Sequence, residues 1–243
     1  MNPIQSSSDR CWSVVPAAGN GSRMQAVLPK QYLTLNDKTV IELTLGKLLH
    51  IAEISGVVVC HADSDTRFGE LAIAKHPRIF TAVGGAERAH SVFNGLCYLR
   101  DMAQSDDADW VMVHDAARPC VSHASLERLL GHCRKTGRGA ILASPVADTL
   151  KRQQANTPII AETVSRDNLW QAHTPQCFRL GELHAALKAA LASGTAITDE
   201  ASAIECSGGD VDLIEDSREN IKITRPEDLA LAGFILGQQA LNW

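Results

Sequence analysis

The sequence lacks several features that would place it in a specialised class of protein. Its seven cysteines are odd in number and include no Cys-x-x-Cys pair, which argues against a disulfide framework or a zinc ribbon. No stretch approaches the ~18 consecutive apolar residues of a membrane span. The opening MNPIQSSSDR has no apolar core of a secretion signal. We therefore expect reduced, mostly buried thiols and a cytoplasmic protein without a membrane partner.

The chain also lacks an excess of positive charge. Lys and Arg number 23 against 28 Asp and Glu, giving a formal net charge of −5. Nucleic-acid binding relies on a broad basic surface and on counterion release, so this composition argues against a nucleic-acid partner. A small anionic substrate stays compatible, because a few cations focused in one cleft can hold a phosphate on an acidic protein.

The distribution of apolar residues favours one α/β domain over residues 1–243. Continuous apolar, β-branched runs alternate with helical patterns, which is typical of a mostly parallel sheet covered on both faces. The sequence therefore predicts a doubly wound α/β fold. The expected strands are 12–16, 56–60, 78–83, 110–114 and 139–144, and the expected helices between them are 40–49, 64–74, 87–102 and 122–135.

This alternation stops after Pro145. Residues 147–168 form two extended pieces around the polar tract 153–158, which indicates a protruding β-hairpin. An isolated hairpin is only marginally stable, so it needs a surface to pack on. We expect that surface to belong to a second copy of the chain, which makes 147–168 the dimerisation arm of a homodimer. The alternative is an arm folded back on its own domain.

The remaining chain returns to regular elements. Helices are expected at 180–192 and 199–206, and strands at 211–214 and 221–223. A final helix opens with Thr224-Arg225-Pro226-Glu227, which has the spacing of a capping box and a proline in the first turn.

The residues after strand 12–16 combine small side chains, glycine and positive charge. Residues 17–21 read Ala-Ala-Gly-Asn-Gly, so the backbone can approach a ligand closely and direct N–H groups at it. Arg23 and Lys30 follow; arginine can bind phosphate oxygens bidentately, while lysine acts as a point charge. The loop is neither a Walker A motif nor a complete dinucleotide fingerprint, yet with these cations it indicates a triphosphate site.

This block resembles the 2-C-methyl-D-erythritol 4-phosphate cytidylyltransferases of the non-mevalonate isoprenoid pathway. The first block marks the wider nucleotidyltransferase superfamily, whereas HDAARP at 114–119, TDEAS at 198–202 and NIKITRPED at 220–228 are more specific. The resemblance spans roughly residues 14–234. It implies a Rossmann-like nucleotidyltransferase fold and transfer of CMP from CTP to 2-C-methyl-D-erythritol 4-phosphate. The products would be 4-diphosphocytidyl-2-C-methyl-D-erythritol and pyrophosphate, in isoprenoid precursor biosynthesis.

Such a reaction needs positive charge rather than a protein nucleophile, because two repelling anions must meet. The resemblance implies that Arg23 and Lys30 stabilise the α-phosphate and the departing pyrophosphate. It implies that Lys222 and Arg166 place the acceptor phosphate, with Arg166 reaching from the arm into the partner's site. Further acceptor contacts implied in the same way are Arg118, Thr149, Thr174 and Thr198; for Thr198 the alternative is the N-cap of helix 199–206.

The nucleotide should be recognised by the loop after strand 12–16, by the Gly84-Gly85 loop with the nearby Ser91, and by Asp115. The expected contacts are Ala17, Ala18, Gly19, Gly21, Gly84, Gly85, Ser91 and Asp115. Asp115 follows strand 110–114 at the carboxyl edge, where parallel sheets bind ligands; it either faces Mg²⁺ through water or bonds a substrate hydroxyl. Mg²⁺ itself is expected mainly on the triphosphate oxygens. Ala86 stands where several family members carry aspartate, which leaves base selectivity open.

Three alternative functions stay open. One is a cytidylyltransferase for another polyol phosphate, such as ribitol 5-phosphate, and another is a sugar-1-phosphate nucleotidyltransferase. The third is a regulatory module that binds CTP without turnover. A His114–Asp115 catalytic dyad is not favoured, because neighbours on a strand point to opposite faces; we interpret His114 as structural.

Overall fold

The computed structural model describes residues 10–19, 28–102 and 105–241, the side chains of the last two excepted. A seven-stranded sheet forms its centre, in the order β11-β7-β10-β6-β1-β4-β5. Only β10 runs antiparallel to its neighbours in this sheet; the other pairs are parallel. The predicted doubly wound, mostly parallel α/β fold is confirmed. The strands are β1 (Cys11–Pro16), β4 (Ile54–His61), β5 (Ile79–Val83), β6 (Trp110–Val113), β7 (Ala140–Pro145), β10 (Trp170–Arg179) and β11 (Asp212–Glu215).

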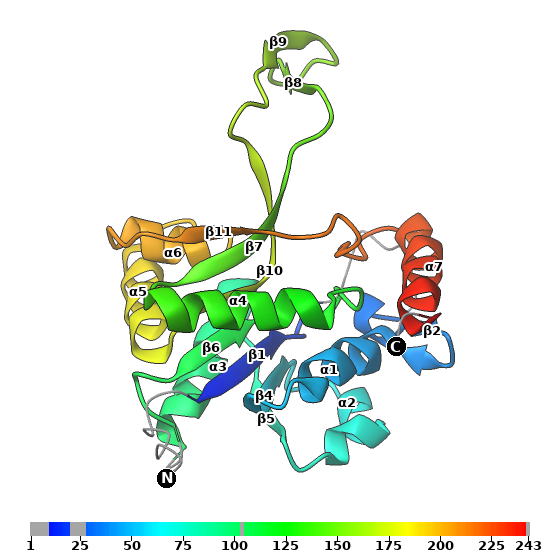
Figure 1. The fold of residues 1–243 in the computed structure, drawn as a ribbon, viewed down its shortest axis with the longest axis vertical. Helices are drawn as coiled ribbons and strands as arrows, with labels where there is room; N and C mark the ends of the chain where they lie inside the picture. The colour runs from blue at the N-terminus through cyan, green and yellow to red at the C-terminus, as the bar shows by residue number, and fades with distance from the viewer. Residues whose placement is uncertain (1–9, 20–27, 103–104, 242–243) are drawn as a thin grey trace.

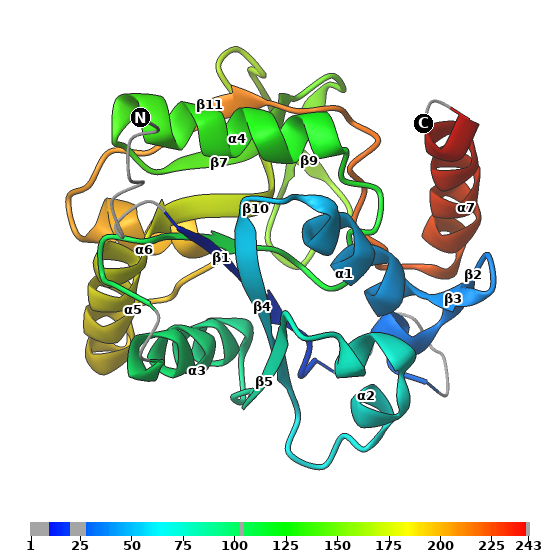
Figure 2. The same ribbon diagram turned by 60° about the horizontal axis from the view of Figure 1, so that its bottom comes forward.

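Helices cover both faces of the sheet (Figure 2). One face carries α3 (Arg88–Asp101), α5 (Leu180–Ser193) and α6 (Glu200–Cys206), and the other carries α1 (Val40–His50) and α4 (His123–Thr136). Adjacent residues of β1 point to opposite faces of the sheet: Val14 packs in the core under α3, α5 and α6, and Val15 packs in the core under α1 and α4. Both side chains are fully buried. This two-sided burial explains why the strands are continuously apolar.

A glycine lets α3 approach the sheet closely. A Cβ at Gly95 would lie 2.6 Å from Cγ1 of Val14 and 2.7 Å from Sγ of Cys60, too close for any larger residue without a shift. The absence of a side chain therefore seats α3 directly on β1 and β4.

Smaller elements lie near α1, outside the central sheet. They are the 3₁₀ turns η3 (Lys30–Tyr32) and η4 (Ala72–Lys75), the two-stranded hairpin β2 (Thr34–Leu35) and β3 (Lys38–Thr39), and the short helix α2 (Arg67–Glu70). The C-terminal helix α7 (Pro226–Leu241) packs beside α1 at one edge of the body (Figure 1).

The predicted hairpin is present as a protrusion. Strands β8 (Leu150–Gln153) and β9 (Ile160–Val164) pair antiparallel, apart from the central sheet. The chain leaves the body after β7, forms the hairpin well above it and returns through β10 (Figure 1). Within this chain the arm extends away from its own domain rather than folding back on it.

Four details of the sequence prediction are wrong. Helix 64–74 is instead α2 and η4, separated by the extended residue Leu71, because only Phe68 among their residues is buried and no continuous apolar stripe exists. Residues 221–223 form no strand. The helix cap at Thr224 uses Asp228, which accepts hydrogen bonds from the Thr224 N–H and hydroxyl, rather than Glu227.

The fourth error is the omission of β10, which lies between β6 and β7. Its sequence is rich in polar residues and contains Pro175, features that argue against a central strand. The register shift between Ala172 and Gln176 accommodates the proline, and hydrogen bonds satisfy the buried His173, Thr174 and Gln176.

All seven cysteines belong to the described residues and are free, and five of them are buried, as expected for reduced thiols. Across the described residues, no helix combines the length and the apolar character that a membrane crossing requires.

Candidate active site

The candidate site lies where the sheet changes winding direction. Strand β1 pairs with β4 on one side and with β6 on the other, and the loops leaving β1 and β6 at their carboxyl ends flank a cavity of about 350 Å³. Ligands of open α/β sheets bind at this kind of switch point. The lining residues are Pro16, Ala17, Ala18, Gly19, Lys30, Gln31, Gly85, Ala86, Glu87, Arg88, Ser91, Asp115, Ala116, Ala117 and Lys222.

Gln31 holds the described part of the small-residue loop. Its buried amide Nε2 donates to the carbonyl oxygens of Ala17 at 2.8 Å and Gly19 at 3.3 Å. The Ala17 N–H donates to Cys60 O at 2.8 Å, which continues the parallel pairing beyond the end of β1. The loop is thus fixed from both sides up to Gly19.

The second loop, after β5, packs against the first. A Cβ at Gly84 would lie 2.5 Å from Cβ of Ala18, so glycine allows the two loops to touch. The Gly84 N–H donates to His61 O at 2.7 Å, and the Gly85 N–H donates to Oγ of Ser91 at 3.0 Å. Both N–H groups are therefore used within the protein, and Ser91 orders the loop from helix α3.

Asp115 is the centre of the charges at the cavity. Its Oδ1 accepts from Nε of Arg88 at 2.9 Å, its Oδ2 lies 2.7 Å from Nζ of Lys222, and Nε of Arg118 lies 3.8 Å from the same oxygen. Burial would raise the pKa of Asp115, but the charges and hydrogen bonds of Arg88 and Lys222 hold it well below its ordinary value. Asp115 is therefore a permanent anion surrounded by cations.

Arg88 is bound on its other side by Glu200. Its Nη1 and Nη2 donate to the two carboxylate oxygens of Glu200 at 2.7 and 3.0 Å, a bidentate pair. Burial would lower the pKa of Arg88, but the charges of Glu200 and Asp115 raise it further above its usual range. Glu200, at the start of α6, is 1% exposed.

His114 supports this cluster from behind and is structural, as expected. Burial lowers the pKa of His114 to about 4, so the ring is neutral at physiological pH. Its Nε2 lies 3.0 Å from Arg118 O and its Nδ1 lies 3.1 Å from the Thr174 hydroxyl, which also accepts from the Asp115 N–H at 3.0 Å. The arrangement fits a proton on Nε2, donated to Arg118 O.

An irregular segment, residues 216–224, brings Lys222 to the cavity. Within the described part of the chain the segment pairs with no strand, and contacts to side chains and loops fix it instead. The Ile223 N–H donates to Ala117 O at 2.9 Å, and Lys30 Nζ donates to Ile223 O at 3.1 Å. Arg118 Nη1 donates to Asn220 O at 2.5 Å. Lys30 and Lys222, 192 positions apart, are thereby attached to the same short segment.

Asp216 anchors the beginning of that segment. This buried carboxylate accepts from the side chains of Ser125 at 2.7 Å and Asn220 at 2.7 Å and contacts Nδ1 of His173 at 3.0 Å. Burial would raise the pKa of Asp216, but these hydrogen bonds lower it. Asn220 also donates to Thr174 O at 2.9 Å, which joins the segment to β10.

The structure brings together most of the residues predicted from the sequence. Eight line the cavity: Ala17, Ala18, Gly19, Lys30, Gly85, Ser91, Asp115 and Lys222. Three more lie directly behind the lining, namely Gly84, Arg118 and Thr174. Gly21 and Arg23 fall outside the described residues.

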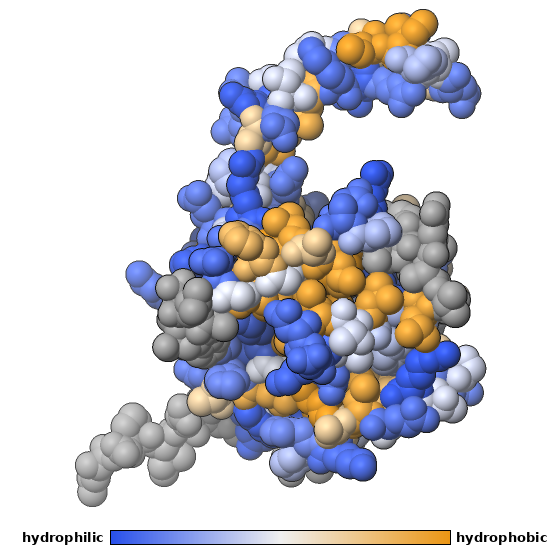
Figure 3. All heavy atoms as spheres, turned by 90° about the vertical axis from the view of Figure 1, so that its right-hand side faces the viewer, coloured by the Kyte–Doolittle hydropathy of each residue, from blue (hydrophilic) through white to orange (hydrophobic). Residues whose placement is uncertain are grey.

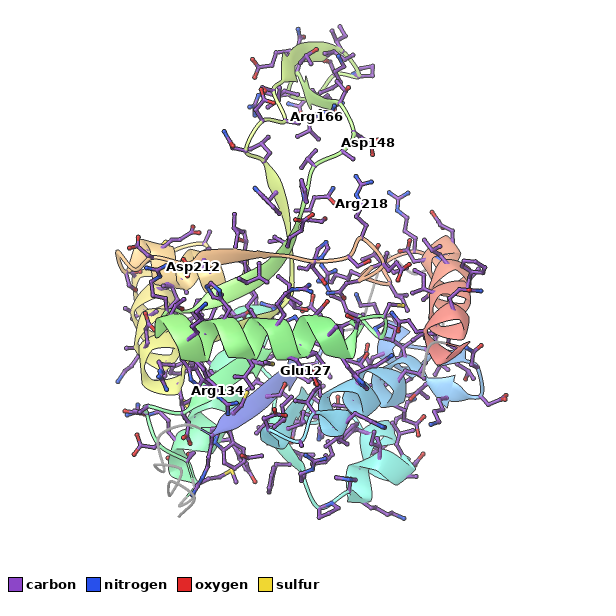
Figure 4. All side chains as sticks on the ribbon, in the orientation of Figure 1. Glu127, Arg134, Asp148, Arg166, Asp212 and Arg218 are labelled. Atoms are coloured by element: carbon purple, nitrogen blue, oxygen red, sulfur yellow. The ribbon has the colours of Figure 1, made fainter. Side chains whose placement is uncertain are left out.

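Three predicted residues do not join the cavity in this chain. Thr149 and Arg166 are exposed on the arm, where Arg166 lies far above the body (Figure 4) and donates to Ala147 O. Thr198 is exposed before α6. It is not the N-cap, because Asp199 occupies that position and forms a capping box with Ser202.

Sequence reasoning missed the side chains that organise the cavity. Gln31, Arg88, Glu200, Asp216 and Asn220 were assigned no role, although Glu200 and Asn220 stand in the blocks 198–202 and 220–228 that carry the resemblance. Their signal would have been polar or charged residues next to short apolar runs, but their partners lie far away in sequence and become evident only in the fold.

The described residues offer little for a metal ion on their own. Among them, no group of three or more His, Cys, Asp or Glu side chains could hold a metal. At the cavity, Asp115 supplies one carboxylate, whose oxygens contact Arg88 and Lys222. This set fits an ion such as Mg²⁺ that takes most ligands from substrate phosphates and water.

A glycine-rich loop, two lysines and a carboxylate at the switch point of a doubly wound sheet define a nucleotidyltransferase type of α/β protein. The family profile of 2-C-methyl-D-erythritol 4-phosphate cytidylyltransferase matches residues 11–238. The chain belongs to this family.

Individual relatives agree with that assignment. The chain is 52% identical over 230 residues to the cytidylyltransferase of this name from Tolumonas auensis, covering 95% of this chain and 98% of the relative. It is 50% identical over 227 residues to that of Vibrio vulnificus, covering 93% and 94%.

Solved structures show the same fold. A crystal structure of 4-diphosphocytidyl-2C-methyl-D-erythritol synthase superposes with a TM-score of 0.81 at 37% identity, covering 94% of this chain and 99% of that one. The Francisella tularensis 2-C-methyl-D-erythritol 4-phosphate cytidylyltransferase gives 0.79 at 35% identity, covering 93% and 99%.

The depressed pKa of Asp115 predicts how stability depends on pH. A carboxylate whose pKa is lowered by folding stabilises the protein above its unfolded-state pKa of about 4, and this contribution is lost below it. Asp115→Asn should lower the free energy of unfolding by about 2 kcal/mol at neutral pH, less than for fully buried pairs because Arg88 and Lys222 are partly exposed. Urea unfolding should show this difference unchanged down to about pH 5 and shrinking below about pH 4. A difference that already narrows between neutral pH and about pH 5 would contradict this assignment.

Proposed function

We propose that the protein transfers CMP from CTP to 2-C-methyl-D-erythritol 4-phosphate, releasing pyrophosphate. Family membership supports the reaction, and one observation supports the location: Lys30 and Lys222 line the same cavity beside the small-residue loop. Two phosphates repel each other at close range, so a site that joins them needs cations between them. The placement of these two lysines answers that need.

The bond changes require positioning more than protein covalent chemistry. An oxygen of the acceptor phosphate attacks the α-phosphorus of CTP; the new O–P bond forms as the bond from the α-phosphorus to the bridging oxygen breaks. The electron pair leaves with pyrophosphate. Lys30, next to the small-residue loop, is suited to the CTP phosphates, and Lys222 to the acceptor phosphate. Arg23 is proposed to join Lys30 on the triphosphate.

Asp115 has the most suitable position for a metal contact. When Mg²⁺ binds with CTP, it supplies charge neutralisation on the phosphate oxygens, and Asp115 is the residue proposed to contact it, directly or through water. Nucleotide recognition is assigned to the loops at Ala17–Gly19, Gly21, Gly84 and Gly85, with Ser91. Arg118, Thr174 and Thr198 are proposed acceptor contacts, the first two because they adjoin Asp115.

The arm is proposed to complete the site of a second copy in a homodimer. Arg166 lies on the arm, away from the body (Figure 4), and Thr149 belongs to the same protruding segment, so a role for either in catalysis requires a neighbouring subunit. The arm exposes the apolar side chains of Ile159 at 56% and Ile160 at 57%. Figure 3 shows apolar atoms at the tip of the arm, and such exposed apolar surface favours burial in an interface. The free thiols favour a reducing compartment, the cytoplasm.

The reaction is tested by an acceptor panel with purified protein, CTP and Mg²⁺, following pyrophosphate release. We expect turnover with 2-C-methyl-D-erythritol 4-phosphate and at least ~100-fold lower kcat/KM with ribitol 5-phosphate or a sugar 1-phosphate, because misplaced acceptors lose the oriented attack. Addition of EDTA should abolish the turnover. Comparable rates with ribitol 5-phosphate would support the alternative acceptor. CTP binding in calorimetry without turnover on any acceptor would support a regulatory module, and full activity in EDTA would remove the metal from the proposal.

The shared site is tested by subunit complementation. Arg166→Ala and Lys30→Ala should each lower kcat by about 10²- to 10³-fold, as the loss of one preorganised charge contact does. Mixing the two variants should restore part of the activity, because half of the sites in a mixed dimer carry both intact residues. Lys30→Ala mixed with Lys222→Ala is the matched control and should restore none, since both residues belong to the same chain's cavity. No recovery in the first mixture, after subunit exchange is demonstrated by differently tagged chains, would argue against an arm that acts in trans.

A further inference from the structure

Arg88 is a cation at the edge of the cavity, yet its contacts are not those of a phosphate ligand. Its Nε points to Oδ1 of Asp115 at 2.9 Å, and both Nη atoms point to the carboxylate of Glu200 at 2.7 and 3.0 Å. Each nitrogen of the guanidinium is thus directed at a carboxylate. Of the five N–H groups of Arg88, one on Nε and one on each Nη are directed at these carboxylates, so a phosphate that bound along either of these two edges would have to displace an anion.

The burial of Glu200 makes its displacement costly. Glu200 is 1% exposed and sits at the first position of α6, whose N-terminus is fixed by the capping box of Asp199 and Ser202. Separating it from Arg88 would leave a buried carboxylate without its counterion, which is strongly unfavourable. The charge of Arg88 is therefore balanced by Glu200, and Arg88 contributes little net attraction for CTP.

Asp115 divides its two oxygens between different kinds of partner. Oδ1 is bound by Arg88, which is held from the protein interior, whereas Oδ2 lies 2.7 Å from Nζ of Lys222. Lys222 is one-third exposed and has a flexible side chain on a segment without regular structure. Lys222 can move to a phosphate; Arg88 cannot.

We propose that Arg88 and Glu200 are positioning residues: Glu200 fixes the guanidinium of Arg88, and Arg88 holds Asp115 in place while Lys222 moves from Asp115 to the acceptor phosphate. This inference rests on the proposed cytidylyl transfer for its kinetic consequences. Asp115, kept in position by Arg88, then presents its released Oδ2 to the metal ion or to a substrate hydroxyl.

Glu200→Gln tests this chain of contacts from Glu200 through Arg88 to Asp115, which we call the relay. The amide keeps the shape of the carboxylate but loses its charge and turns an N–H toward Arg88. We expect kcat to fall by about 10- to 100-fold, the usual effect of losing a partner that orients an active-site ligand. KM for CTP should stay within about 3-fold, because neither residue binds the triphosphate. Asp107→Asn is the matched control. It weakens a similar bidentate pair between Asp107 and Arg100, and Arg100 lies at the opposite end of α3 from Arg88. This variant should leave kcat unchanged.

Arg88→Lys is the second variant, since lysine keeps the charge but cannot bridge two carboxylates. It should show the same loss of kcat, and it decides alone if Glu200→Gln does not fold. Parental kcat in a folded variant would overturn the proposal. So would a KM for CTP raised more than about 10-fold at unchanged kcat, which would make Arg88 a triphosphate ligand.

A double-mutant cycle separates this proposal from the proposed function. In an Asp115→Asn background, Glu200→Gln should lower kcat by less than about 3-fold, because the relay acts through Asp115. The same cycle measured by urea unfolding needs no substrate and should be equally non-additive. Additive effects on unfolding would overturn the relay, whereas a parent protein without CMP transfer would overturn only the proposed function.

Discussion

The site depends on one electrostatic constraint: like charges must be held close together before a substrate arrives. Lys222, Arg88 and Arg118 lie within 4 Å of Asp115, and without that carboxylate they would repel one another. The protein meets the constraint by placing one anion at the switch point of the sheet, directly after β6. Glu200 contributes a second anion from a helix on the other side of Arg88.

The fold supplies the rigidity that such a cluster requires. Strand β6 consists of four fully buried apolar residues, and Gly95 allows α3 to sit directly on the sheet. The loop after β1 is held by the hydrogen bonds of Gln31 to Ala17 and Gly19. The less regular partner, segment 216–224, is instead fixed by the buried carboxylate of Asp216 and by Asn220. Lys30 and Lys222 therefore have flexible side chains that meet at a well-anchored backbone segment. If Lys30 leaves Ile223 O, the segment keeps its contacts through Asp216, Asn220 and the Ile223 N–H.

The sequence was a good guide to the sheet because parallel, doubly covered strands are continuously apolar, as in β1, β4 and β6. It failed at β10, where burial of His173, Thr174 and Gln176 depends on hydrogen bonds to distant residues that no local pattern reports. It failed at 221–223 for a related reason: the segment is held by the Ile223 N–H on Ala117 O and by Arg118 on the neighbouring Asn220 O, not by strand pairing.

In the candidate site, too, the residues with a local sequence pattern could be predicted and those that depend on distant contacts could not. Residues on the glycine-containing loops, together with Lys30, Asp115 and Lys222, stand in recognisable blocks and do meet at one cavity. The supporting residues Gln31, Arg88 and Glu200 could not be assigned roles from sequence, since a role such as charge balance exists only between partners brought together by the fold. Thr149 and Arg166 remain predictions, because neither lines the cavity of its own chain and both belong to the protruding arm, where Figure 4 labels Arg166.

The most direct measurement is a crystal structure of the protein with a non-hydrolysable CTP analogue and 2-C-methyl-D-erythritol 4-phosphate. We expect Lys30 Nζ on a triphosphate oxygen and Lys222 Nζ on the acceptor phosphate, with Arg88 still bridging Asp115 and Glu200. Phosphates bound by Arg88, with Lys222 remaining on Asp115, would contradict it.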